Sequence, residues 1–248
     1  MPSLPSTTVR HHPTLDALSQ AVAQDLTTDI QQTVPSQDRY TLALAGGSTP
    51  QRLYELLAEE AAGPLPWAQI HLFWGDERFV PHDHPKSNVR MVAHALTSHV
   101  PIPDANIHPI PTQPARPEAA AVAYTETLQD YFSDRSATFD TVLLGLGADG
   151  HTASLFPETD TPEGRRTDDA WVRVVNAPPR HNVSTRLTCT LPTLNGARRA
   201  AFLVAGERKR DSLAAVLNQN DSRLPAAQIK PRESLLWYVD DAAHPSSA

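Results

Sequence analysis

A short, almost wholly apolar segment in the middle of the chain constrains its fold more than any other feature. Residues 142–146 read VLLGL, and such a run fits a strand buried on both faces of a parallel sheet better than the alternation of a half-exposed strand. Three glycines follow closely, at positions 145, 147 and 150, and leave the backbone free to turn. Asp149 and His151 lie among them. Because ligands of open α/β sheets bind beyond the carboxyl ends of the strands, this stretch predicts an active-site edge.

The same glycines satisfy the G-x-G-x-x-G pattern of dinucleotide-binding proteins. Asp149 argues against a dinucleotide, because its charge would lie where the pyrophosphate rests against a helix N-terminus. No clear acidic residue closes a second strand about 20 residues further on. We therefore do not expect a nicotinamide or flavin cofactor.

Predicted strands and helices alternate along the chain, which is typical of a mainly parallel sheet with helices on both faces. We expect a three-layer α/β fold, with residues 1–14 as a loose N-terminal arm, 15–240 as a single domain and 241–248 as a C-terminal tail. The expected strands are 40–45, 70–74, 107–110, 142–146, 171–175, 200–205 and 235–239. The expected helices are 15–30, the segment after Pro50, 88–99, 119–132 and 207–217, and the polar segment 159–169 is expected to be a mobile loop.

The charge balance limits the possible partners. There are 28 Asp and Glu against 21 Lys and Arg, a formal charge of −7, which argues against nucleic acid or an anionic membrane as the main partner. Cys189 is the only cysteine, so no intrachain disulfide can form. No run approaches the roughly 20 apolar residues of a membrane span, and the first residues lack the apolar core of a signal peptide. We expect a cytoplasmic protein that is a monomer or a weak homo-oligomer.

The segment after strand 40–45 has the features of an anion site. Gly46 and Gly47 precede Ser48 and Thr49, either of which can cap a helix that Pro50 begins. Free backbone N–H groups and the helix dipole favour a phosphate at such a turn, although the Gly-Lys-Ser/Thr ending of a Walker loop is missing. An ordinary capped turn is the alternative interpretation.

A second polar cluster follows strand 70–74. Asp76, Glu77 and Arg78 stand at its carboxyl end, and Arg78 can bind a phosphate through two parallel hydrogen bonds. An exposed salt-bridged cluster is the alternative. The sequence His82-Asp83-His84 resembles a metal-binding pair but lacks the further ligands of a closed site, so we expect no metal.

Five segments together resemble the family of 6-phosphogluconolactonase and glucosamine-6-phosphate deaminase. They are LAGGSTP at 44–50, GDERFVPHDHPKSN at 75–88, GLGADGHTASLFP at 145–157, RLTCTLPTLN at 186–195 and LPAAQI at 224–229. The resemblance implies a fold like that of ribose-5-phosphate isomerase and the deaminase. It also implies hydrolysis of 6-phospho-D-glucono-1,5-lactone to 6-phosphogluconate in the pentose phosphate pathway, with no cofactor or metal.

Such a hydrolysis needs a base for water, stabilisation of an oxyanion and an anchor for the phosphate. His151 is the expected base, because an ordinary imidazole changes charge near neutral pH, and Asp149 is expected to orient its ring. Asp76 is the competing base, since the deaminase uses an acid in its corresponding segment, and His181 is a weaker rival. No G-x-S-x-G elbow is present, so direct attack by water is favoured over an acyl-enzyme.

The expected phosphate anchor combines backbone, hydroxyl and cationic donors. Its members are Gly46, Gly47, Ser48, Thr49, Arg78 and Arg186. Lys209 either reaches the same pocket or lies on a helix surface, and the loop before Arg186 leaves open whether Arg186 or Arg180 meets the phosphate. Ser87 and Asn88 either contact sugar hydroxyls or hold the loop.

Two other functions compete with the lactonase. The resembling deaminases carry Asn-Glu-Pro after their Gly-His segment, where this chain has Leu155-Phe156-Pro157, and the missing acid removes a group needed for ring opening. A non-catalytic sugar-phosphate sensor would keep the pocket without turnover.

Overall fold

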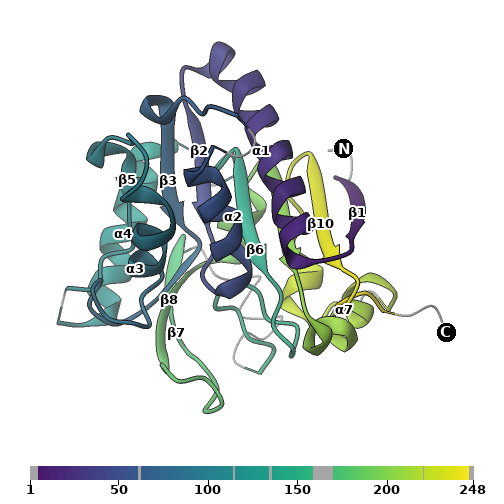
Figure 1. Cartoon of the computed structure of the whole chain (residues 1–248). Coiled ribbons are helices and arrows are strands. Elements are labelled where there is room, and N and C mark those ends of the chain that lie inside the picture. Colours follow the sequence, from purple (N-terminus) through teal and green to yellow (C-terminus); the bar gives the residue numbers. More distant parts are fainter. Residues whose placement is uncertain are drawn as a thin grey trace.

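The main sheet has seven strands, and every neighbouring pair in it is parallel (Figure 1). A computed structural model describes residues 5–60, 63–113, 115–133, 136–158, 170–219 and 221–245. Across the sheet the order is β1 (Ser6–His12), β10 (Ser234–Asp240), β9 (Arg199–Val204), β6 (Thr141–Gly145), β2 (Tyr40–Leu44), β3 (Ile70–Trp74) and β5 (Ile107–His108). The expected strand 107–110 is thus shorter than predicted. The segment 159–169 lies outside the described residues.

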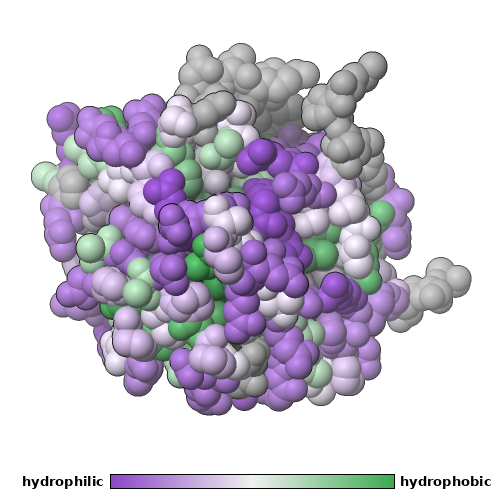
Figure 2. All heavy atoms as spheres, turned by 90° about the horizontal axis from the view of Figure 1, so that it is seen from above, coloured by the Kyte–Doolittle hydropathy of each residue, from purple (hydrophilic) through white to green (hydrophobic). Residues whose placement is uncertain are grey.

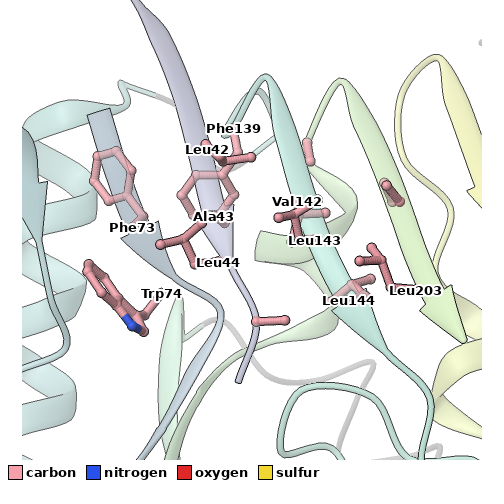
Figure 3. Packing of buried hydrophobic residues seen from close by; sticks show 14 of the residues in the cluster. Leu42, Ala43, Leu44, Phe73, Trp74, Phe139, Val142, Leu143, Leu144 and Leu203 are labelled. Carbon is pink, nitrogen blue, oxygen red and sulfur yellow. The ribbon is translucent and has the colours of Figure 1, made fainter. Parts of the chain in front are cut away.

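The centre of the sheet is the core. All five residues of β2 are buried, and β6 is buried up to Gly145. Figure 3 shows the apolar side chains of β2, β3, β6 and β9 packed on the sheet. The absence of polar alternation in VLLGL therefore reflects burial of both faces, as expected for a central parallel strand.

The described α-helices are α1 (Leu15–Gln37), α2 (Ser48–Ala58), α3 (Asn88–Val92), α4 (Pro117–Tyr131), α6 (Leu191–Asn195) and α7 (Arg210–Leu217), with a π turn over Ala93–Thr97 and 3₁₀ turns over Trp67–Gln69, Asp104–Asn106, Glu207–Lys209 and Pro225–Gln228. The expected cap of α2 by Ser48 or Thr49 is not formed, because the helix already begins at Ser48 and its N-cap is Gly47. Thr14 caps α1 by accepting from Ala17 N, and Ser87 caps α3 by accepting from Arg90 N. Helices α1 and α2 pack on each other in front of the sheet (Figure 1). The predicted α/β class, a mainly parallel sheet with helices on both faces, is confirmed.

A second, antiparallel sheet was not expected from the sequence. It consists of β4 (Asp76–Arg78), β8 (Thr185–Cys189) and β7 (Val172–Asn176), in that order, and α4 packs against β7 and β8. Strand β4 has only three residues, all of them polar, so its sequence shows no alternation of polar and apolar residues. It is a strand only because it pairs with β8, which lies far along the chain. This sheet begins one residue after β3 ends and therefore stands beside the carboxyl edge of the large sheet.

The prediction of a loose N-terminal arm is wrong for residues 6–12. They form β1, which pairs in parallel with β10 along its whole length. Its side chains are mostly exposed, so no apolar pattern marked it. The expected tail is also anchored in part, because Ala243 is buried and its N–H donates to Asp240 Oδ1 at 2.8 Å. The limits of the single domain, 15–240, stay a prediction.

Seen from above, polar side chains cover most of the visible face, and apolar ones lie in small areas between them (Figure 2). Within the described ranges, no helix is long and apolar enough to cross a membrane.

Candidate active site

The carboxyl ends of β2, β3 and β6 meet at one pocket of about 290 Å³. Because parallel strands end at the same sheet edge, turns far apart in sequence converge there. The pocket is lined by nearly all of the site residues expected from the sequence, namely Gly46, Gly47, Ser48, Thr49, Asp76, Arg78, Asn88, His151, Arg186 and Lys209. Asp149 and Ser87 do not line it: Asp149 is hydrogen-bonded to His151, which does, and Ser87 is bonded to Glu77.

The turn between β2 and α2 supplies backbone N–H groups at a helix N-terminus. Gly47 has φ 108° at the N-cap of α2, a conformation that favours glycine. A Cβ on Gly46 would lie 1.9 Å from Asn88 Oδ1, so Asn88 fills the space that a side chain at position 46 would need. Close packing therefore favours glycine at position 46, and the backbone conformation favours it at position 47.

Two arginines face each other across the small sheet. Arg78 and Arg186 are direct partners in the β4–β8 ladder, an arrangement that is unfavourable for like charges. Arg78 donates to Lys86 O at 2.8 Å and Arg186 to Val183 O at 3.2 Å. Within the part of the chain that the structure describes, neither forms an ion pair with a carboxylate. Burial, and to a smaller extent the charge of Arg78, lowers the pKa of Arg186.

Lys209 adds a third cation to the pocket from the 3₁₀ turn before α7. Burial lowers the pKa of its ammonium, against the opposing charge of Asp149. Three cations around one pocket favour an anionic ligand, because its charge would offset both their mutual repulsion and their desolvation. Of the two places that the sequence allowed for Lys209, the pocket is where it lies.

His151 and Asp149 form a hydrogen-bonded pair at the other side of the pocket. His151 Nδ1 lies 2.5 Å from Asp149 Oδ1. Burial by itself would raise the pKa of Asp149, but the hydrogen bonds from His151 and Arg180 outweigh it and hold this pKa well below its usual range. A Cβ on Gly147 would lie 2.0 Å from His151 Nδ1 and 2.5 Å from Asp149 Oδ1, so Gly147 makes room for the pair. A proton on Nδ1 leaves Nε2 with the free lone pair of a base.

The structure separates the two arginines that the sequence left as alternatives. Arg180 donates to Asp149 Oδ2 and to Glu158 Oε1, the latter at 3.0 Å, whereas Arg186 lines the pocket. His181 lies edge-on to His151, with ring centroids 5.3 Å apart. Burial lowers the pKa of His181. Arg180 and His181 therefore lie at Asp149, and of the two arginines Arg186 is the one that lines the pocket.

Asp76 lies in the pocket but is held by a residue that the sequence did not single out. Its Oδ2 accepts a hydrogen bond from Ser154 Oγ at 2.6 Å, and both side chains are buried. The polar segment HTAS gave no signal for this contact, because it depends on how the loop after β6 folds back on β4.

Glu77 has a structural role at the start of α3. It is fully buried, and its carboxylate accepts from the N–H groups of Arg78, Asn88 and Val89 and from Ser87 Oγ, at 2.7 to 2.9 Å. Burial raises its pKa against these bonds. The alternative of an exposed salt-bridged cluster at 76–78 is therefore wrong. Ser87 holds the loop, and Asn88 both lines the pocket and donates from Nδ2 to Asp76 O at 2.9 Å.

One cluster of the described residues has the donor types of a metal site. Ligand atoms of Asp149, His151 and His181 all lie within 4.8 Å of one another, one ligand short of a closed tetrahedral set. The histidines of the segment 82–84 serve the loop instead, since His82 Nε2 lies 2.8 Å from Ile110 O and His84 Nδ1 accepts from Lys86 N.

The fold and the pocket define an α/β protein that binds a small anionic molecule at the carboxyl edge of a parallel sheet and holds a histidine–aspartate pair beside it. The family model of glucosamine-6-phosphate isomerases/6-phosphogluconolactonase matches residues 13–237. The chain belongs to this family.

Individual relatives agree with the family model. The chain is 43% identical over 223 residues to a 6-phosphogluconolactonase of Synechocystis, covering 88% of this chain and 89% of the relative. The crystal structure of a 6-phosphogluconolactonase from Thermotoga maritima superposes with a TM-score of 0.82 at 30% identity, covering 95% of this chain and all of the other. A monomeric glucosamine-6-phosphate deaminase shares the fold, with a TM-score of 0.79 at 22% identity.

Proposed function

We propose that this chain is a lactonase that hydrolyses 6-phospho-D-glucono-1,5-lactone to 6-phosphogluconate, a step of the pentose phosphate pathway. One observation carries the proposal: a single pocket is lined by three cations with no carboxylate ion pair in the described chain and by His151, which is hydrogen-bonded to Asp149 behind it. Such a pocket suits a substrate with a phosphate at one end and an ester at the other. Two relatives that match 88% and 87% of this chain, from Synechocystis and Nostoc, are both named 6-phosphogluconolactonase.

In the proposed reaction, His151 acts as general base through Nε2. It takes a proton from water as the water oxygen attacks the lactone carbonyl carbon, and Asp149 stabilises the imidazolium that forms. The tetrahedral intermediate then loses the ring oxygen, and the imidazolium returns its proton to that leaving oxygen. The products are a free hydroxyl and a carboxylic acid, which ionises and releases a proton to solvent.

The phosphate is held by the N-terminus of α2 together with Arg78, Arg186 and Lys209. A phosphate dianion matches both the backbone donors of residues 46–49 and the facing guanidinium groups. The net charge of −7 makes this local cluster necessary, since the overall field of the protein repels the substrate.

Asp76 remains the competing base. Its Oδ2 is occupied by Ser154, which leaves Oδ1 to accept a proton. We favour His151, because its partner Asp149 provides the orientation and charge stabilisation that a histidine base needs.

The segment Leu155-Phe156-Pro157, where the resembling deaminases carry Asn-Glu-Pro, favours the lactonase over a deaminase. Leu155 and Phe156 are fully buried, and the Phe156 ring lies 4.7 Å from that of His151. The Phe156 ring packs against the histidine, and neither residue provides an acid for ring opening.

The direct test follows acid release from freshly prepared lactone, corrected for spontaneous hydrolysis. A rate well above the spontaneous one supports the proposal. Binding of 6-phosphogluconate without acceleration would instead identify a sugar-phosphate sensor. A cytoplasmic location, the absence of nucleic-acid binding and a monomeric or weakly oligomeric state are further parts of the proposal, supported by charge and composition alone.

A further inference from the structure

The backbone of Ala45, the residue after strand β2, is hydrogen-bonded to the hydroxyl of Tyr54. Strand β2 pairs with β3 only up to Leu44, so the next peptide groups leave the ladder. Tyr54 Oη accepts from Ala45 N at 3.0 Å and donates to Ala45 O at 2.8 Å. Tyr54 is fully buried, so no water is available to replace these two bonds.

The position of Tyr54 in the chain makes this contact a tie across the turn. Tyr54 belongs to α2, the helix whose N-terminus opens on the pocket, and Ala45 is the last residue before Gly46. One hydroxyl therefore fixes the distance between the end of the strand and the body of the helix, with residues 46–49 held between them. Burial raises the pKa of Tyr54 far above its usual value, so the hydroxyl keeps the proton that it donates.

The turn is also fixed from its outer side. Asn88 Oδ1 occupies the place of a Cβ at Gly46, and Asn88 Nδ2 is bonded to Asp76 O. With Tyr54 on the inner side and Asn88 on the outer side, the backbone donors of this turn have little freedom to shift.

The neighbouring strand β3 also ends on a pair of hydrogen bonds to a buried tyrosine hydroxyl, but β4 and not a helix N-terminus follows it. Tyr124 Oη, from α4, accepts from Trp74 N at 2.9 Å and donates to Trp74 O at 3.2 Å. Tyr124 is also fully buried. It ties the end of β3 to a helix that contributes no residue to the pocket lining, so it offers a matched comparison.

We propose that Tyr54 is a positioning residue of the anion site, which holds the backbone donors of residues 46–49 in place for a phosphate group. The proposal rests on the assignment of this turn to phosphate binding in the proposed function. It assigns Tyr54 no contact with substrate. Its effect reaches the ligand through Ala45 and the two glycines.

The test compares Tyr54→Phe with Tyr124→Phe, each of which removes one buried oxygen and two hydrogen bonds. Calorimetric titration with inorganic phosphate and with 6-phosphogluconate measures the anion site without turnover. For Tyr54→Phe we expect both dissociation constants, and KM for the lactone, to rise about five- to thirtyfold, with kcat within about twofold. Tyr124→Phe should lower Tm about as much as Tyr54→Phe does, because it loses the same two hydrogen bonds. It should leave the phosphate dissociation constant within about twofold. If Tyr54→Phe fails to fold, 4-fluorophenylalanine at position 54, which fills the volume of the hydroxyl without donating, takes its place.

Two results would overturn the proposal. One is an unchanged phosphate affinity in the folded Tyr54 variant, and the other is an equal loss of affinity in Tyr124→Phe, which would indicate general loosening of the sheet edge. The proposed lactonase function fails separately, if the wild-type protein binds phosphate and 6-phosphogluconate but does not accelerate lactone hydrolysis.

Discussion

His151 Nδ1 lies 2.5 Å from Asp149 Oδ1, and the two residues reach this distance only because position 147 lacks a side chain. The pair lies on the loop that follows β6, where Gly147 leaves room for both side chains and Gly150 turns the chain at φ 82°. Asp149 is bound on its other oxygen by Arg180, so it stays ionised and holds the imidazole in one orientation.

We expect His151→Ala to lower kcat about 10²- to 10⁴-fold with little change in KM, because it removes the proposed base and leaves the anion site intact. Asp149→Asn should also lower kcat, since an amide can present its N–H to Nδ1 and disfavour the productive tautomer. Steady-state kinetics of acid release measures both effects. Asp76→Asn is the comparison, and full activity in His151→Ala together with an inactive Asp76→Asn would make Asp76 the base.

Arg186→Met should raise KM for the phosphorylated lactone about tenfold or more, because a hydrogen-bonded charge is lost from the phosphate site. Hydrolysis of unphosphorylated gluconolactone should change much less. Arg180→Met is the control, since Arg180 pairs with Asp149 and Glu158, and its effect should fall on kcat. An equal rise in KM for Arg180→Met would return Arg180 to the phosphate site.

Glu77→Ala should destabilise the fold by roughly 3 kcal/mol, because four donors, two of them fully buried, lose their acceptor. Urea unfolding measured by fluorescence or circular dichroism gives the change in free energy. Glu59→Ala serves as the control, since Glu59 is exposed and should change the free energy of unfolding by less than about 0.5 kcal/mol. Unchanged stability in Glu77→Ala would contradict the structural role of Glu77.

Stability should fall as the pH drops from about 7 to 5. His71 Nδ1 lies 3.2 Å from His108 Nε2, and burial lowers the pKa of both side chains in the folded protein, with Arg39 adding to the effect on His71 and His71 to that on His108. The unfolded chain therefore takes up protons first, near pH 6.5, and this uptake favours unfolding. Urea unfolding at pH 7.5 and 5.5 measures the difference.

The double variant His71→Gln/His108→Gln should weaken this pH dependence without abolishing it. His11 and His12 have pKa values that burial lowers too, so they contribute a remainder of the same sign. A double variant with the full wild-type pH dependence would show that the β3–β5 pair of histidines is not its source.

The sequence by itself determined the parallel sheet and the turns at its carboxyl edge. The apolar segments of β2, β3 and β6 need no partner to be recognised, because burial on both faces removes polar residues from a strand. Gly46, Gly47 and Gly147 were likewise visible, since positions 46 and 147 leave no room for a Cβ and position 47 has a positive φ. These local signals were enough to place His151 and the 46–49 turn at one edge.

Only the tertiary structure decided which charged residues meet there. Arg186 faces Arg78, and Arg180 goes to Asp149, because β8 pairs with β4 in one register, and no local pattern encodes the register of a three-residue strand. Two other features also depend on distant partners. Glu77 is buried because it accepts hydrogen bonds from the start of α3, and residues 6–12 are a strand because they pair with β10. Their partners lie far along the chain, and hydrogen bonding between distant segments leaves no periodicity in the sequence of either one.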